Sequence, residues 1–364
     1  MSMDFALFYE IPVPRPWGPD SDHIAYKNTI AQAVHGEKSG FTSFWTVEHH
    51  FLDEYSHCSA PDALYGAIAA QTTTMRIGHG VRLLPYPYNH PVRAAEAAAV
   101  VDLVSDGRLE FGTGRSSTRA ELEGFGADPN LTRAQWEEGL RLVVDAWTND
   151  TFEADGPTWK VPPRRLHPKP LQQPHPPLWV ASTNPDSHAI AGELGLGLLS
   201  FTIGVPPEEL AERIKIFRDA QTRVSNPIGK FVNNRAATFT MVHCADTDEQ
   251  AFAEAAESFE WYVRTALWHI GTVAEWQAGK PLGTYEYAAA INELDLTLLT
   301  FDYLQSSGAC IVGGPDRCLE VARRYDAADC DILLCLVNPY KMSHESVMHS
   351  IELLGEHVIP ELKG

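Results

Sequence analysis

The sequence alternates short apolar segments with helical ones along most of its length, and this alternation limits the possible folds more than any other feature. Eight of the apolar segments have the character of buried strands. The expected strands are residues 4–10, 41–47, 76–85, 108–114, 177–183, 197–201, 235–245 and 330–337. Alternating strands and helices indicate a parallel sheet. Eight such units are the number that closes a barrel.

We therefore expect an α/β fold, a (β/α)8 TIM-type barrel, in preference to an open doubly wound sheet. An open sheet that binds a dinucleotide would carry a complete GxGxxG turn, and "FGTGRSS" (111–117) has only two of those glycines. The chain reads as one domain over 1–364, with insertions at about 150–177 and 271–308. The first insertion is rich in proline and the second in Gly, Tyr and polar residues, so neither is expected to be regular throughout.

The overall charge excludes several classes of partner. The formal net charge is −20 at pH 7, so nucleic acid and anionic membrane surfaces are not expected to bind. No run of eighteen apolar residues predicts a membrane helix, and "MSMDFALFYEIPVP" lacks the basic region of a secretory signal. The six cysteines form no CxxC pair, which favours reduced thiols in the cytoplasm. An anionic cofactor would need local cations, and the candidates are Arg82, Arg93, Arg108, Arg115 and Arg119.

Two strand ends combine into a candidate phosphate site. Active sites of such barrels lie at the carboxyl ends of the strands. After the fourth strand, "GTGRSS" supplies flexible backbone, the Arg115 guanidinium and the hydroxyls of Ser116 and Ser117. After the fifth strand, "STNPDSH" (182–188) opens a helix, whose free N–H groups and dipole attract anions. Helix capping or a surface ion pair explains either segment alone, but together they predict phosphate binding.

Three ionisable side chains, Glu48, His49 and His50, end the second strand in "FWTVEHHF". Such groups are costly beside an apolar strand unless something uses them. A metal site is disfavoured, because adjacent histidines diverge on a strand and the chain has neither HxH nor HExxH. Structural histidines are a second interpretation. We favour an acid/base or proton-positioning His49 at the barrel mouth. Weaker candidates of the same type are His57, His79 and His90.

Aromatic residues also follow the expected strands. They are Trp45, Phe51, Tyr86, Tyr88 and Phe201. Such side chains can flank a flat heterocycle, although each would pack equally well in a core. The residues expected to shape a substrate pocket are Glu48, His50, Phe51 and Phe201. Neither a GxSxG motif nor a Cys/His pairing favours nucleophilic catalysis.

Together these segments resemble the bacterial luciferase-like flavin monooxygenases, best between residues 40 and 201. "FWTVEHHF" is similar to the family's strand-two motif, and "LLPYPYNHPVRAAEAAAVVDLVSDGRLEFGTGR" to its strand-three to strand-four block. "PPLWVASTNPDSHAIAGELGLGLLSF" is similar to its phosphate-binding fifth strand and helix. The resemblance implies an eight-stranded barrel, usually dimeric, that binds FMN. Many members receive reduced FMN from a separate NAD(P)H:flavin reductase and use O2 to oxygenate a small organic substrate.

By the same resemblance, His49 stands at the family's catalytic histidine and Arg115 at its phosphate-binding arginine. Thr183 stands where luciferase carries an acidic residue in the phosphate shell. Gly114 stands where luciferase has a reactive cysteine, a difference that argues against light emission without excluding oxygenation. The implied cofactor-binding set is Leu84, Gly114, Arg115, Ser117, Ser182, Thr183, Asn184 and Ser187.

Three other functions remain open at this point. One is a deazaflavin-dependent hydride transfer on the same barrel, another is a non-catalytic flavin-binding protein, and the third is a metal hydrolase. We favour a cytoplasmic, homodimeric flavoprotein oxidoreductase that uses reduced FMN and O2 on a small molecule. No bound metal and no nucleic-acid or membrane partner are expected.

Overall fold

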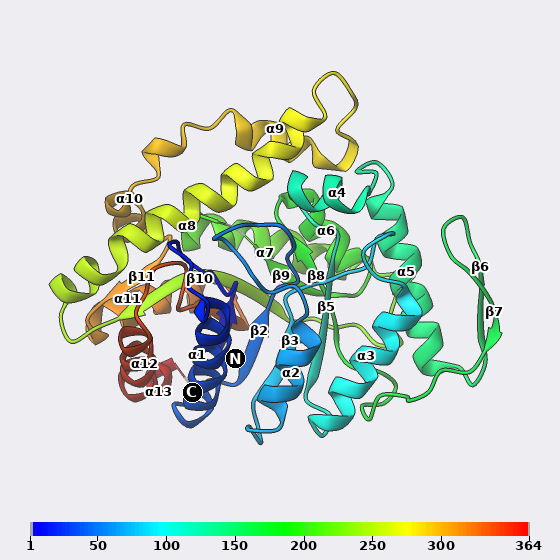
Figure 1. Cartoon of the computed structure of the whole chain (residues 1–364), viewed down its shortest axis with the longest axis horizontal. Helices are drawn as coiled ribbons and strands as arrows, with labels where there is room; N and C mark the ends of the chain where they lie inside the picture. Colours follow the sequence, from blue (N-terminus) through cyan, green and yellow to red (C-terminus); the bar gives the residue numbers. More distant parts are fainter. Residues whose placement is uncertain (1–2, 202, 363–364) are drawn as a thin grey trace.

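The computed structural model describes residues 3–201 and 203–362, and its central feature is a closed parallel barrel (Figure 1). Each barrel strand pairs with the next, and the last pairs with the first. In order around the barrel, the strands are β1 (Asp4–Tyr9), β2 (Ser43–Thr46), β3 (Arg76–His79), β5 (Leu109–Gly114), β8 (Leu178–Ser182), β9 (Gly197–Ser200), β10 (Ala236–Cys244) and β12 (Ile332–Leu336). The predicted eight-stranded barrel is therefore confirmed, and the open sheet is excluded.

Helices surround the barrel on its outside (Figure 1). They are α1 (Ser21–Lys38), α2 (Pro61–Ala69), α3 (Pro91–Val104), α5 (Thr132–Thr148), α6 (Pro185–Glu193), α7 (Pro207–Gln221), α11 (Pro315–Ala327) and α12 (His344–Leu353). Five of them begin with proline. Proline suits the first helical position because its missing N–H would have no partner there. A π-helical turn, Leu354–Val358, and α13 (Ile359–Leu362) close the described chain.

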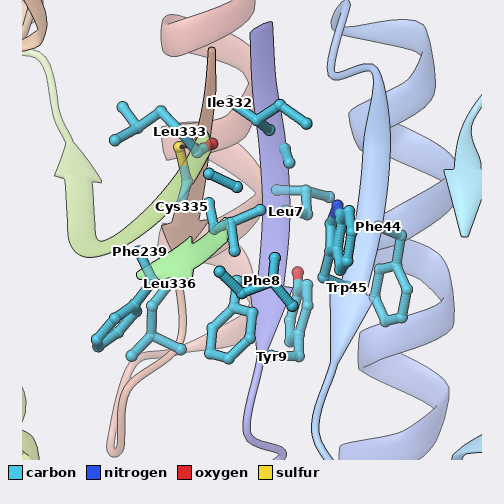
Figure 2. Close-up of a cluster of buried hydrophobic side chains, with 14 of the residues drawn as sticks. Leu7, Phe8, Tyr9, Phe44, Trp45, Phe239, Ile332, Leu333, Cys335 and Leu336 are labelled. Carbon is cyan, nitrogen blue, oxygen red and sulfur yellow. Dashed lines mark hydrogen bonds between the residues drawn. The ribbon is translucent and has the colours of Figure 1, made fainter. Parts of the chain in front are cut away.

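Successive side chains of a strand point to opposite faces, so β1 contributes to two packed layers (Figure 2). On β1, Phe8 lies 5.5 Å from Phe239 between ring centroids, in the barrel interior. The neighbouring Tyr9 stacks on Phe44. Gly78 makes room for the Trp45 ring, since a Cβ there would lie 2.1 Å from that indole. The same alternation turns the residue after Tyr9 inward again, toward the carboxyl end of the barrel.

The first predicted insertion contains a β-hairpin that the sequence pattern did not predict. Strands β6 (Phe152–Asp155) and β7 (Lys160–Arg164) pair antiparallel beside α5 (Figure 1). Their alternation is weak, and prolines occupy two positions of β7. Prolines are tolerated on such an edge strand, because it need not donate from every residue.

The second predicted insertion is more helical than expected. Helix α8 (Asp248–Trp276) continues into the first residues of this insertion. It is followed by η1 (Gly283–Tyr285), α9 (Glu286–Asn292), η2 (Leu296–Leu298) and α10 (Phe301–Ser307). Helices α8 and α9 cross the top of the barrel as drawn in Figure 1. The short elements α4 (Arg119–Phe125) and β11 (Ile311–Gly313) and the helix α11 were not predicted, and the predicted strand 76–85 is divided into β3 and β4 (Arg82–Leu83).

Two further expectations concerned membrane helices and the number of domains. Among the described residues, no helix is both long enough and apolar enough to cross a bilayer. The single domain over 1–364 stays a prediction, and its ends at 1–2 and 363–364 lie outside the described residues.

Candidate active site

A cavity opens at the carboxyl ends of the barrel strands, beneath α8. Its volume is about 1220 Å³, including the part that is open to solvent. The predicted site residues that line it are Glu48, His49, Gly114, Arg115, Ser117, Thr183, Asn184, Ser187 and Phe201. The strands thus bring together residues from four separate parts of the sequence, as expected for a barrel of this kind.

Four predicted residues lie outside this lining. Leu84 and Ser182 are buried behind the wall, and the Ser182 hydroxyl donates to the backbone oxygen of Ser187 at 3.1 Å. His50 and Phe51 line a separate outer pocket, and the Phe51 side chain is 63% exposed. The His49 side chain borders both spaces.

Two guanidinium groups mark one end of the cavity. Arg115 donates to the hydroxyls of Thr132 at 3.2 Å and Thr284 at 2.6 Å, and lies over the Tyr285 ring. Arg133, which the sequence analysis missed, also lines the cavity. Its Nε atom is buried and has no hydrogen-bond partner in the described part of the chain. Burial lowers the pKa of Arg133, and the neighbouring Arg115 lowers it further.

A signal for Arg133 was present in the sequence. It is the second residue of α5, where the helix dipole disfavours a positive charge. None of the other proposed arginines lines the cavity. Arg82 pairs with Asp62, Arg93 with Glu96 and Arg119 with Glu123, while Arg108 donates to backbone oxygens that include those of Ala69 and Met75.

The start of α6 forms part of the same wall. Asn184 Oδ1 accepts from the Ser187 N–H at 3.0 Å, and Ser187 Oγ accepts from the Asn184 N–H at 3.1 Å. Ser187 Oγ also accepts from the Thr183 N–H at 3.1 Å. This capping box holds the three side chains in fixed positions. Both interpretations of the segment therefore apply: it caps the helix, and it lines the cavity near the two arginines.

A buried carboxylate orients His49 in the cavity wall. Glu121 Oε1 accepts from His49 Nδ1 at 2.9 Å and from the His50 backbone N–H at 3.1 Å. Its second oxygen accepts from Ser116 and Thr118. Thr118 and Glu121 occupy the capping-box positions of α4, a T-x-x-E signal that could have revealed this helix. Burial alone would raise the pKa of Glu121, but His49 and these donors lower it.

A second carboxylate, Glu10, follows β1 and lies on the other side of the ring. Its Oε1 accepts from Tyr55 at 3.2 Å and Tyr262 at 3.0 Å. Its Oε2 lies 3.5 Å from His49 Nε2. Burial lowers the pKa of His49, but Glu121 and Glu10 outweigh it and raise the pKa to about 9. His49 is therefore predominantly cationic at neutral pH.

The two neighbours of His49 have different surroundings. Glu48 accepts from the Leu83 N–H at 3.0 Å and from Asn89 Nδ2 at 2.8 Å. These bonds tie the loop after β4 to the end of β2. His50 Nε2 lies 3.5 Å from Glu48 Oε1 and its ring packs on Phe125. Glu48 therefore helps to form the cavity wall, whereas His50 belongs to the outer pocket.

The weaker histidine candidates lie away from the cavity lining. His57 pairs with Asp22, and the buried His79 lies 3.3 Å from Asp62. His90 accepts from the Val92 N–H at the start of α3. Among the described residues, no group of three or more His, Cys, Asp or Glu side chains is arranged to hold a metal ion.

The remaining wall is largely apolar and aromatic. It includes Val180, Phe201, Ile203, Phe239, Ala266 and Ile270. Such a wall excludes water from a bound ligand. The cavity thus combines a cationic end, a histidine held by carboxylates, and apolar walls.

The comparison with known protein families decides the identity of the fold. The model of the family "Luciferase-like monooxygenase" matches residues 3–329.

The chain belongs to the luciferase-like monooxygenase family.

Its relatives agree with this assignment. The oxygenase component of the flavin-dependent trigonelline monooxygenase of Acinetobacter baylyi is 26% identical over 268 residues, which cover 73% of this chain and 72% of that protein. This luciferase-like protein is accordingly an oxidoreductase, and the prediction of a flavin-dependent monooxygenase is confirmed at the level of the family.

Two solved structures share the fold. The oxygenating constituent of 3,6-diketocamphane monooxygenase from Pseudomonas putida, a type II Baeyer-Villiger monooxygenase in complex with FMN, has a TM-score of 0.78 at 20% identity and 99% coverage of both chains. An F420-dependent secondary alcohol dehydrogenase in complex with an F420-acetone adduct has a TM-score of 0.72 at 18% identity and full coverage of both chains. Proteins of this fold therefore occur in complex with FMN and with an F420 adduct.

Proposed function

We propose that this luciferase-like monooxygenase binds reduced FMN, with the phosphate at Arg115 and Arg133 and the flavin in the cavity that His49 borders. The observation that carries the proposal is the pair of guanidinium groups at one end of this apolar cavity. A dianionic phosphate supplies the charge that these cations lack among the described side chains. Four of the cofactor-binding residues predicted from the sequence line the cavity with polar side chains and would support the phosphate: Ser117, Thr183, Asn184 and Ser187.

The residues fit such a group in two respects. The buried Nε of Arg133 has no hydrogen-bond partner in the described chain, so an acceptor from a ligand would satisfy it. Gly114 lines the cavity without a side chain. A Cβ there would lie 2.4 Å from Val81 Cγ2, so this part of the wall has no room for one. Reduced FMN, when bound, would supply the electrons that activate O2.

The protein's own groups manage protons and water around that chemistry. His49 holds a proton near neutral pH and presents Nε2 beside the cavity. Glu121 fixes the ring through Nδ1 and stabilises its positive charge. The apolar wall, including Phe201 and Phe239, keeps water away from the reacting groups.

The remaining partners follow from this proposal. The substrates are O2 and a small organic molecule that fits the apolar part of the cavity. A separate NAD(P)H:flavin reductase supplies the reduced FMN, which agrees with the name "oxygenase component" of the trigonelline enzyme. We place the protein in the cytoplasm.

We also propose a homodimer. The outer face of α3 exposes the apolar side chains of Val100, Leu103 and Val104, which are 46%, 38% and 52% exposed. Burial of these side chains against a second copy would remove apolar surface from water. Size measurement in solution tests this assembly.

The second candidate function is hydride transfer with a deazaflavin, supported by the F420-dependent dehydrogenase of the same fold. A panel of small apolar compounds, incubated under ¹⁸O2 with reduced FMN or reduced deazaflavin, separates the two. We expect a product that has gained one ¹⁸O atom, with reduced FMN only. Turnover of a substrate with deazaflavin alone would establish the hydride-transfer function. Oxygen uptake without an organic product across the panel would support a non-catalytic flavin-binding protein.

A further inference from the structure

We propose that Glu10 is a second positioning residue for His49, and that its carboxyl group exchanges the proton carried by His49 Nε2. The inference rests on the proposed function, in which His49 moves a proton at the cavity. Glu10 follows the first strand, far in sequence from the "EHHF" segment and from α4. Glu10, His49 and Glu121 meet only in the folded barrel.

The geometry around Glu10 separates its two oxygens. Oε1 is occupied, because it accepts from the hydroxyls of Tyr55 and Tyr262. Oε2 is buried, has no hydrogen-bond partner among the described residues, and lies 3.5 Å from His49 Nε2. The Glu10 side chain is almost fully buried and lines the cavity. Glu10 Oε2 is therefore free to exchange a proton with His49 Nε2, the imidazole nitrogen that borders the same cavity.

The two carboxylates act on different nitrogens of one ring. Glu121 takes Nδ1 at 2.9 Å and so fixes the orientation of the imidazole. Only Nε2 remains for exchange with a group in the cavity. The pKa of Glu121 is lowered, whereas burial raises the pKa of Glu10 against the opposing effect of His49. In active sites, paired titratable groups whose surroundings push their pKa values apart typically take different acid and base roles.

The other titratable groups around this pair do not replace Glu10. From α8, Tyr262 donates to Glu10, and burial together with the positive His49 lowers the pKa of His269 to about 4. His269 is therefore neutral near neutral pH. From the end of β2, Glu48 is engaged by Leu83 and Asn89. The remaining charged or titratable neighbours are Tyr55, Cys58 and Glu121.

The proton balance is simple. The His49 Nε2 proton passes to a basic atom of the reacting molecule in the cavity, which leaves a neutral ring. The Glu10 carboxylate then takes up a proton from solvent and passes it to Nε2, which restores both groups to their starting state. No bond between heavy atoms is made or broken, and no oxidant is needed.

The test is the titration of His49 in the cofactor-free protein, followed by NMR of the imidazole nitrogens after selective histidine labelling. His49→Gln assigns the signal by its loss. Glu10→Gln should weaken proton binding by His49 about tenfold, because one of two adjacent carboxylates loses its charge. The Nδ1 signal, which reports the bond to Glu121, should stay unchanged. An unchanged His49 titration in Glu10→Gln would overturn the proposal.

Tyr262→Phe provides a second variant if Glu10→Gln does not fold. It removes one donor from Glu10 Oε1, which favours the neutral carboxyl and should lower the pKa of His49 by a smaller amount. The matched control is Tyr65→Phe, which removes a buried hydroxyl that donates to the Thr46 backbone oxygen. An equal response in both tyrosine variants would contradict the proposal. Failure to bind reduced FMN would overturn the proposed function without changing this titration.

In the active enzyme, the same substitution should move the pH profile of turnover. Glu10→Gln should shift the alkaline limb to lower pH, because His49 loses its proton earlier. Glu10→Asp should cause a smaller shift than Glu10→Gln, since the carboxylate is retained. A loss of activity with an unchanged pH profile would mean that Glu10 only supports the fold.

Discussion

His49 Nδ1 lies 2.9 Å from Oε1 of Glu121, a carboxylate with no exposure to solvent. The two residues are 72 positions apart in the sequence. Their contact explains how one imidazole at the barrel mouth stays both oriented and charged. It also makes Glu121 the residue whose removal should separate catalysis from flavin binding.

Glu121→Gln is expected to slow turnover by about 10²-fold, the usual contribution of general acid–base assistance. The dissociation constant of reduced FMN should change little, because Glu121 lies outside the cavity lining. Turnover and anaerobic flavin binding are the measurements. Glu123→Gln is the matched control, since Glu123 belongs to the same helix and pairs with Arg119 on the surface. Equal losses of turnover and of binding would show that Glu121 is only structural.

Arg133→Ala is expected to weaken binding of reduced FMN about tenfold to a hundredfold, the value of a charge-assisted hydrogen bond. Binding of reduced riboflavin, which has no phosphate, should be unchanged. Arg141→Ala provides the control on the same helix, because Arg141 pairs with Glu137 away from the cavity lining. If FMN and riboflavin weaken alike, the phosphate does not lie at Arg133.

Gly114→Ala is expected to lower the free energy of unfolding by about 1–3 kcal/mol, the usual cost of overpacking. The new Cβ would lie 2.4 Å from Val81 Cγ2. Gly66→Ala is the control, because a Cβ there has no atom within 4 Å and the residue lies inside α2. That variant should be neutral or slightly more stable. Denaturant unfolding measures both, and equal stability would show that the strand β5 has room for a side chain.

Stability should also depend on pH through His49. Its pKa is raised from 6.5 to about 9 in the folded protein. The contribution of its charge is therefore fully present below pH 6.5 and is lost as the pH rises through about 9. The difference in unfolding free energy between wild type and His49→Gln should shrink over that interval. A difference that grows toward alkaline pH would contradict the raised pKa.

The barrel was predictable because its signals are local. Apolar segments such as "FWTV" and proline-led helices such as α3 fix the strand and helix order. The strand ends then placed His49, Arg115 and Asn184 at one face, since parallel strands share a carboxyl edge. Those residues do line one cavity.

The rest of the site depends on packing between distant segments. Glu121 reaches His49 because α4 folds over the end of β2, and Tyr262 reaches Glu10 because α8 crosses the barrel mouth. No periodicity in either segment reports that contact. The position of Arg133 in the first turn of α5, where the helix dipole disfavours a positive charge, was visible in the sequence. Only the fold brings Arg133 to the cavity that Arg115 lines.

Anaerobic titration of the purified protein with reduced FMN tests the central claim most directly. We expect saturable binding of one FMN per chain, at micromolar concentration or below, and weaker binding of reduced riboflavin. Absence of binding at micromolar FMN would contradict the account, and so would equal affinity for FMN and riboflavin.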